Sequence, residues 1–265
     1  MDNASVQSFE LCPPVRLRTL RGVLTDIDDT LTADGRIEAV ALAALRRLHE
    51  EGLPVIAITG RPAGWSEPFA RSWPLQAIVA ENGAVMLRRS GGGVRHDFTA
   101  DEPTRSANFQ RLQACANDVQ ARVPGARLAT DSSGRLTDIA IDHSEFAHLD
   151  VAQIAAVSAV MREHGLQATV SSIHINGWIG EHSKWTGARW AVETALDVPF
   201  RPHEWLYVGD STNDETMFER MPLSVGVANI ARFAPRMRHL PAYVTRGERG
   251  EGFAEVAAAL LAAQE

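Results

Sequence analysis

Residues 21–30 read RGVLTDIDDT, a short apolar run that breaks into three acids and a threonine. Apolar residues followed directly by charge predict a buried strand that ends in a polar loop. Residues 37–51 then carry a helical apolar stripe that stops at a glycine. Further apolar runs at residues 53–58 and 77–80 predict the next two strands. Strands that alternate with helices in this way predict a parallel sheet with helices on its faces.

The pattern changes after about residue 88, where a glycine-rich stretch interrupts it. The next segments read, in order, as a helix at 101–122, strands at 126–130 and 137–142, a helix at 150–164, and a second strand pair over 167–179 around Asn176-Gly177. This order predicts a separate α+β module with a small antiparallel sheet. A helix at residues 184–196 and a strand at 205–210 then resume the first pattern, so the module interrupts a larger domain.

We therefore predict an α/β protein with a Rossmann-like parallel-sheet core formed by residues 19–88 and 183–265. The inserted α+β module spans residues 89–182. Residues 1–18 are polar and contain prolines, which predicts a loose lead-in. The length of 265 residues is enough for one large domain or two smaller ones.

The composition narrows the class of protein. With 45% hydrophobic and 22% charged residues, the chain is typical of soluble globular proteins, and its apolar runs are too short to span a membrane. The net charge of −7 argues against non-specific nucleic-acid binding, which needs a basic surface. The first residues lack the basic-then-apolar order of a secretory signal, and two cysteines cannot form a disulfide framework. We expect a cytoplasmic protein that binds neither membrane nor nucleic acid, and the pattern favours no oligomeric state.

Four polar features follow the predicted strands or the inserted module. They are Asp26-Ile-Asp28-Asp29-Thr30, Thr59-Gly60-Arg61, Lys184 and Gly209-Asp210-Ser-Thr-Asn213-Asp214. Ligands of open α/β sheets bind at the carboxyl ends of the strands, so we expect these residues to share one site.

In this order, the four features resemble the motifs of the haloacid-dehalogenase-like superfamily of phosphatases. The place of the inserted module resembles the cap of the class IIB subgroup, which includes sugar phosphatases and phosphomannomutase. The run Glu81-Asn-Gly-Ala84 is similar to a turn of that subgroup. The resemblance spans about residues 20 to 255. Asp29 departs from it, because many relatives have glycine there, and its carboxylate adds a negative charge beside the site.

The resemblance implies roles for the first motif. Asp26 is the expected nucleophile, because a carboxylate can attack phosphorus and divide the reaction into two easier steps. Asp28 is expected to protonate the leaving oxygen and later to activate water, which favours a hydrolase. Thr30 would hold Asp28 by a hydrogen bond.

Clustered carboxylates repel one another and the phosphate, so the resemblance also implies a cation. All-oxygen ligands at this density suit Mg²⁺. The expected ligands are Asp26 and Asp210 directly, Asp28 through its backbone carbonyl, and Asp214 directly or through water. The expected phosphate-binding groups are Thr59, Gly60, Lys184 and Asn213. Possible substrate-binding residues are Arg61, Asn82, His174 and Asn176.

Each motif also has a purely structural interpretation. Acids after a strand serve as loop residues or helix caps, and Asp214 lies where the helix dipole favours an acid. Lys184 is different, since a cation is disfavoured in a first helical turn and an anionic ligand would account for it. His174 and Asn176 fit a solvated strand face equally well, and His143 and Arg135 are expected at the surface.

The function predicted from these features is Mg²⁺-dependent hydrolysis of a phosphate monoester of a small metabolite through an aspartyl-phosphate intermediate. A sugar phosphate is the expected substrate. One alternative is a phosphosugar mutase like phosphomannomutase, which shares the motifs and the cap position. A non-enzymatic phosphoacceptor resembling a response-regulator receiver is another, although receivers are shorter and their acid pair is adjacent. A dinucleotide-binding dehydrogenase is disfavoured, because no Gly-x-Gly-x-x-Gly follows the first strand.

Overall fold

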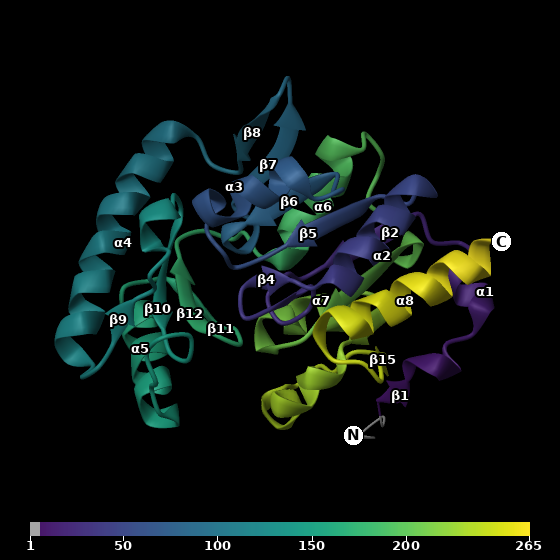
Figure 1. The fold of residues 1–265 in the computed structure, drawn as a ribbon. Helices are drawn as coiled ribbons and strands as arrows, with labels where there is room; N and C mark the ends of the chain where they lie inside the picture. The colour runs from purple at the N-terminus through teal and green to yellow at the C-terminus, as the bar shows by residue number, and fades with distance from the viewer. Residues whose placement is uncertain (1–5) are drawn as a thin grey trace.

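The computed structural model describes residues 6–265, and within this range nine strands form one sheet (Figure 1). Their order is β1 (Gln7–Ser8), β15 (Tyr243–Val244), β14 (Ser224–Gly226), β13 (Trp205–Gly209), β2 (Gly22–Thr25), β5 (Val55–Ile58), β6 (Ala77–Ala80), β7 (Val85–Ser90) and β8 (Gly93–Phe98). The pairs from β1 to β6 are parallel, and β7 and β8 add an antiparallel hairpin at one edge. The predicted α/β class with a Rossmann-like sheet is confirmed.

Helices cover both faces of this sheet, because successive strand side chains point to opposite faces. Val23 packs in the core with α2 (Ala39–Glu50), α3 (Ala63–Ser72) and α8 (Arg249–Gln264). Its neighbour Leu24 packs in the core of the other face, with α6 (Lys184–Ala195) and α7 (Glu215–Arg220). Strands that are apolar on both sides therefore hold the loops after β2, β5 and β13 at one edge of a rigid sheet.

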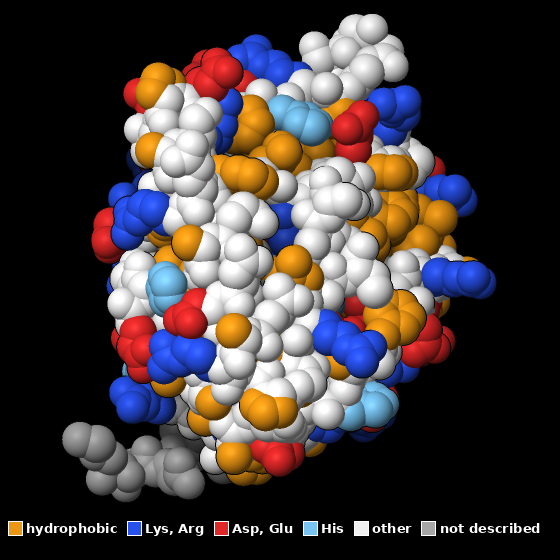
Figure 2. Space-filling view, turned by 90° about the vertical axis from the view of Figure 1, so that its left-hand side faces the viewer, with side chains coloured by type: hydrophobic (Ala, Val, Ile, Leu, Met, Phe, Trp, Pro, Cys, Tyr) orange, Lys and Arg blue, Asp and Glu red, His pale blue; other side chains and the backbone are white. Residues whose placement is uncertain are grey.

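A second, antiparallel sheet lies between β8 and α6 in the chain and on the left of Figure 1. Its order is β11 (Gln167–Val170), β12 (His174–Trp178), β10 (Asp138–Asp142) and β9 (Arg127–Leu128). The helices α4 (Glu102–Arg122) and α5 (Val151–Glu163) pack on it around a separate apolar core. Figure 2 shows the face of the molecule on this side, where acidic and basic side chains are interspersed. Among the described helices, none is long and apolar enough to cross a membrane.

Three segments differ from their predicted structure. The predicted boundary at residue 89 falls inside the β7–β8 hairpin, because all six residues of β7 pair with β8 and continue the large sheet to Phe98. Of the predicted loose lead-in, residues 1–5 lie outside the described residues, whereas β1 pairs with β15 and Phe9 and Leu17 are buried.

The third difference is the turn between β11 and β12. It lies at residues 171–173, where the Ser171 hydroxyl accepts hydrogen bonds from the amides of Ile173 and His174. Asn176-Gly177 lies within β12 instead. Gly177 packs beneath Met161, whose sulfur would lie 2.8 Å from an added Cβ, so the glycine allows close packing and forms no turn.

Candidate active site

Three buried carboxylates meet at the edge where β2 and β13 end. Asp26 follows β2, and Asp210 follows the adjacent parallel strand β13, so strand pairing brings the two together. Asp214 joins them from the 3-10 turn that begins at Thr212. One oxygen from each of the three carboxylates lies within 4.8 Å of the others. Burial raises the pKa of Asp26 to about 8, with Lys184 opposing the shift and repulsion from Asp214 adding to it.

Lys184 is the cation in contact with this cluster. Its ammonium group donates to Asp26 Oδ1 at 2.6 Å and to Asp214 Oδ1 at 2.6 Å. Ser183 caps α6 and places Lys184 in the first helical turn, where the helix dipole disfavours a cation. Burial also opposes its charge, but the two carboxylates outweigh this effect and raise the pKa of Lys184.

Asp214 organises the loop that carries Asp210. Its Oδ2 accepts hydrogen bonds from the backbone amides of Asp210 and Ser211, at 2.8 and 3.0 Å. Its Oδ1 accepts from the hydroxyl of Tyr207 as well as from Lys184. Each oxygen therefore has two donors, which fixes the carboxylate.

The donor set fits a hard divalent cation. Within residues 6–265, the buried Asp210 Oδ1 has no hydrogen-bond partner, although such atoms are usually satisfied. Three carboxylates face one lysine, which leaves an excess of buried negative charge. Asn229, which the sequence analysis missed, donates to Asp210 Oδ2 at 3.2 Å and to the backbone carbonyl of Asp29 at 2.9 Å. Asn229 therefore connects the loop after β2 to Asp210, while Oδ1 of Asp210 stays available to a cation such as Mg²⁺.

The remaining predicted site residues lie around a small cavity next to the cluster. Its volume is about 10 Å³, which is space for about one water molecule. The predicted residues that line it are Asp26, Asp28, Thr59, Gly60, Arg61, His174, Asn176 and Asn213. Lys184 and Asn82 line a neighbouring cavity of about 290 Å³ that shares Asn213.

Arg61 holds Asp28 in place. Its Nε donates to both carboxylate oxygens, at 3.0 and 3.1 Å. The hydroxyl of Thr30 is buried and has no hydrogen-bond partner in the described part of the chain, so the predicted bond to Asp28 is not made. Asp29 adopts a positive φ of 53°, a conformation that favours glycine, and its Oδ1 lies 2.9 Å from Arg249 Nε. Its additional charge is therefore paired.

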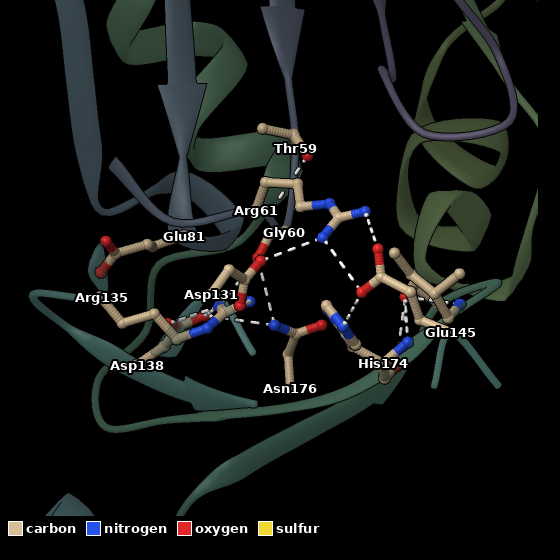
Figure 3. A network of polar contacts seen from close by, with 12 residues as sticks. Thr59, Gly60, Arg61, Glu81, Asp131, Arg135, Asp138, Glu145, His174 and Asn176 are labelled. Atoms are coloured by element: carbon tan, nitrogen blue, oxygen red, sulfur yellow. Dashed lines mark hydrogen bonds and ion pairs between the residues drawn. The ribbon is translucent and has the colours of Figure 1, made fainter. Parts of the chain in front are cut away.

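The loop after β5 is supported from the second sheet. The carbonyl oxygen of Gly60 accepts from Arg135 Nη1 at 3.0 Å and from Asn176 Nδ2 at 3.1 Å. Asn176 and Asn82 both also donate to Asp138. A Cβ at Gly60 would lie 3.2 Å from the Oδ1 atoms of Asn176 and Asn82, so a larger residue here would need these two side chains to shift by a few tenths of an ångström. The loop predicted to bind phosphate is thus fixed by side chains of the second sheet (Figure 3).

Several buried residues differ from the sequence interpretation. His174 and Asn176 are 2% and 1% exposed, so the solvated strand face is wrong for both. Arg135 and His143 are also buried, because Arg135 binds Asp138 at 2.8 Å and His143 donates to the Ser171 carbonyl. The partner of His143 lies 28 positions further along the chain, which no local pattern identifies, whereas Arg135 and Asp138 are only three residues apart.

Two further acidic residues hold the site together and were not predicted from the sequence. Glu81 accepts hydrogen bonds from the backbone amide of Ala63, which begins α3. It also accepts from the backbone amides of Leu136 and Thr137, which precede β10 of the second sheet. Glu145 binds Arg61 and His174. The only local signal for Glu81 was its place in the turn after the third strand, and Glu145 lies in a loop without a motif.

Comparisons with known proteins agree with this geometry. Residues 23–109 match the family model of haloacid dehalogenase-like hydrolases. The phosphoglycolate phosphatase of Methanoculleus marisnigri is 28% identical over 249 residues, which cover 89% of this chain and 94% of the relative. That of Methanothermobacter thermautotrophicus is 26% identical and covers 89% and 96%.

Solved structures share the fold. Thermoplasma acidophilum 0175 superposes with a TM-score of 0.70 at 18% identity, covering 91% of this chain and 98% of its own. The sucrose-phosphatase of Synechocystis sp. PCC6803 gives a TM-score of 0.66 at 15% identity, with coverage of 92% and 98%.

Proposed function

Since this chain belongs to the haloacid dehalogenase-like hydrolases, as a class IIB phosphoric monoester hydrolase, we propose that it is a magnesium-dependent phosphatase of a small metabolite. The observation that carries the proposal is the position of Asp26. This carboxylate lies beside Asp210 and Asp214, binds Lys184, and lines one cavity with Asp28 and the loop after β5.

In the first half-reaction, an oxygen of Asp26 attacks phosphorus and forms an acyl phosphate. The bond from phosphorus to the ester oxygen breaks, and its electron pair stays on that oxygen, which takes a proton from Asp28. Lys184 binds Oδ1 of Asp26, so Oδ2 is proposed as the attacking atom. Arg61 orients Asp28 through both of its carboxylate oxygens.

In the second half-reaction, water attacks the phosphorus of the acyl phosphate. Asp28, now a carboxylate, takes the proton of the water, and the bond from phosphorus to Asp26 breaks. Inorganic phosphate leaves, and both carboxyl groups return to their starting states. Thr59, Gly60, Lys184 and Asn213 are proposed to hold the other phosphate oxygens throughout.

The proposed direct ligands of Mg²⁺ are Asp26, Asp210 and the backbone carbonyl of Asp28. The unpartnered Oδ1 of Asp210 supports this assignment. Asp214, whose oxygens each already have two donors, is proposed to bind the ion directly or through water. When bound, the ion neutralises the carboxylates and the charge on the transferring phosphoryl group.

The unit formed by the second sheet is proposed to act as a cap that selects the substrate. Phosphoglycolate is the first substrate to test, because relatives that match along almost their whole length carry that name. Sugar phosphates are the second class to test, since the sucrose-phosphatase shares the fold, although its sequence is only 15% identical.

The test is a phosphate-release assay with 2-phosphoglycolate, several sugar phosphates and acetyl phosphate, each with Mg²⁺ and with excess chelator. We expect release that needs Mg²⁺ and is lost in Asp26→Asn. Full activity in chelator, or no release from any monoester, would contradict the proposal. Interconversion of sugar phosphates that needs a sugar bisphosphate would instead identify the mutase.

A further inference from the structure

The guanidinium group of Arg61 holds a carboxylate of the protein itself (Figure 3). Nη2 donates to Glu145 Oε1 at 2.9 Å, and Nη1 donates to Oε2 at 3.3 Å. His174 Nε2 adds a third hydrogen bond to Oε2, at 3.0 Å. Arginine recognises carboxylates by this geometry, in which two parallel N–H groups face the two carboxylate oxygens.

The same arginine also binds the proposed general acid. Its Nε faces Asp28, while the Nη atoms face Glu145, so both carboxylates lie on one planar group. A substrate oxygen that receives a proton from Asp28 therefore lies close to any carboxylate bound at the Nη atoms. Only a short molecule places an ester oxygen and a carboxylate so near each other.

Glu145 has space to move, whereas its partners do not. The side chain of Glu145 is 21% exposed, but Arg61 and His174 are 4% and 2% exposed. Glu145 and Arg61 line an outer cavity of about 390 Å³, which shares Asp28 and Arg61 with the inner cavity of about 10 Å³. The Glu145 side chain can thus rotate outward while Arg61 and His174 stay in place.

The charges around Arg61 favour such an exchange. Three carboxylates, those of Asp28, Asp131 and Glu145, contact this single guanidinium group. Burial opposes ionisation of Glu145, but hydrogen bonds from His174 and Arg61 outweigh it and lower its pKa to about 2. Glu145 is therefore an anion at neutral pH. An anionic substrate that enters beside it is repelled unless Glu145 leaves.

We propose that Arg61 and His174 form a binding subsite for a substrate carboxylate, and that Glu145 is an internal carboxylate which the substrate displaces. The inference rests on the proposed phosphatase function and names its substrate class. The substrates are short phosphorylated acids in which the carboxylate is attached to the carbon that carries the phosphoester oxygen, as in 2-phosphoglycolate. Sugar phosphates lack this carboxylate and leave Glu145 on Arg61.

The test compares 2-phosphoglycolate with 2-hydroxyethyl phosphate, in which a hydroxymethyl group replaces the carboxylate. The quantity measured is kcat/KM for 2-phosphoglycolate divided by kcat/KM for 2-hydroxyethyl phosphate. A substitution that alters the chemistry of Asp28 changes both values alike, so its effect cancels in this ratio. We expect the wild type to prefer 2-phosphoglycolate at least tenfold. Glu145→Gln should raise the ratio about fivefold, mainly through a lower KM for 2-phosphoglycolate, because the competing charge is removed.

Substitutions of Arg61 and His174 test the subsite from the other side. Arg61→Lys keeps the charge but loses the paired Nη donors, and it should lower the ratio about tenfold. His174→Asn should also lower it. Glu163→Gln removes a cap carboxylate that pairs with Arg122 at the surface, and it should leave the ratio unchanged.

The outcomes separate this inference from the phosphatase proposal. Acetyl phosphate hydrolysis that requires Mg²⁺, together with a ratio near one in all variants, overturns the subsite and keeps the phosphatase. If the wild type releases phosphate from none of the substrates in the presence of Mg²⁺, both proposals are overturned. A ratio that falls in Glu145→Gln shows that Glu145 helps to bind the substrate, which also overturns the displacement proposed here.

Discussion

Asp26 is buried and has one cationic partner, Lys184. Replacing Asp26 tests whether its carboxylate is the nucleophile. Asp26→Asn keeps the shape of the side chain and an oxygen that can accept from Lys184, but it removes the attacking charge. We expect the rate of phosphate release to fall by more than about 10³-fold. The fold should persist, because burial already raises the pKa of this carboxyl and disfavours its charge.

The matched control for this change is Asp34→Asn, the same substitution at an exposed residue of the following loop. It should retain the wild-type rate. Circular dichroism and thermal melting of both variants separate lost chemistry from lost structure. A folded Asp26→Asn protein with more than a tenth of wild-type turnover is incompatible with covalent catalysis by this residue.

Asp28 differs from Asp26 in its partner, which leads to a different prediction. Arg61 Nε binds both of its oxygens, so Asp28→Asn keeps one of these contacts but cannot supply a proton. Hydrolysis of an alkyl phosphate should fall by about 10²–10⁴-fold. In single-turnover phosphoenzyme formation, an aryl phosphate with a good leaving group should lose far less. Equal losses for the two substrates would argue against a general acid at this position.

Whether a contact of the site could be predicted from the sequence depends on how far apart its two residues lie along the chain. The acids and Lys184 were predicted because each follows a strand or begins a helix, and parallel strands bring such positions together. Glu145 was missed because its contact with Arg61 joins residues 84 positions apart. The bond predicted from Thr30 to Asp28 failed for a related reason, since Arg61, from another strand, occupies both oxygens.

The first turn of α6 positions Lys184, and two glycines allow its close approach to the sheet. A Cβ at Gly187 would lie 2.7 Å from the Cα of Gly83 and 3.0 Å from a methyl group of Val79. Gly187→Ala should therefore push the helix outward at a cost of about 1–3 kcal/mol. Alanine gains ~1 kcal/mol over glycine within a helix, so the net loss in the free energy of unfolding should reach up to about 2 kcal/mol. Displacement of Lys184 should also lower kcat by about tenfold.

Arg189→Ala is the control for this prediction, because Arg189 is exposed on the same helix. Its effect on the free energy of unfolding should stay within about 0.5 kcal/mol. Urea unfolding and steady-state kinetics measure both effects. A Gly187→Ala protein that is more stable than the wild type would show that the turn at Gly83 yields easily and does not fix α6.

Among the elements, the fully buried strands were the most predictable. The run at residues 77–80 matches β6 residue for residue, because burial on both faces requires continuous apolar side chains. The β11–β12 turn was less predictable, since Asn176-Gly177 is typical of a turn but serves packing and a cross-interface hydrogen bond. Tertiary contacts overrode local turn preference there.

The two sheets of the molecule meet through buried polar groups, and this explains how the site is closed. Glu81 joins α3 to residues 136 and 137, and Thr212 donates to the carbonyl of Val170. The space left above Asp26 is about 10 Å³, far smaller than a phosphate ester. We therefore expect the second sheet to shift relative to the first when a substrate enters through the outer cavity, and its return to exclude water from the reaction.

The acidic cluster couples metal binding to the stability of the whole fold. Asp26 and Asp210 follow two central strands, and among residues 6–265 Lys184 on α6 is the one cationic side chain that pairs with this cluster, through Asp26 and Asp214. Burial, together with repulsion from Asp214 and Asp26, raises the pKa of Asp210 well above its ordinary value, so its charge is costly in the folded protein. We expect bound Mg²⁺ to offset this cost only in the folded state, which would shift unfolding to higher temperature.

At 100 times its Kd, Mg²⁺ should add about 2.7 kcal/mol to the free energy of unfolding. For a chain of this size, that is a rise in Tm of about 5–10 °C. Asp210→Asn should lose this rise, yet it should melt above the wild type in chelator, because one buried like charge is gone. The exposed Asp197→Asn control should keep the wild-type response in both conditions. Differential scanning calorimetry of the three proteins, with Mg²⁺ and in chelator, measures all of these Tm values. If Asp210→Asn melts lower than the wild type in chelator and still responds to Mg²⁺, Asp210 is a structural acid and the ion binds elsewhere.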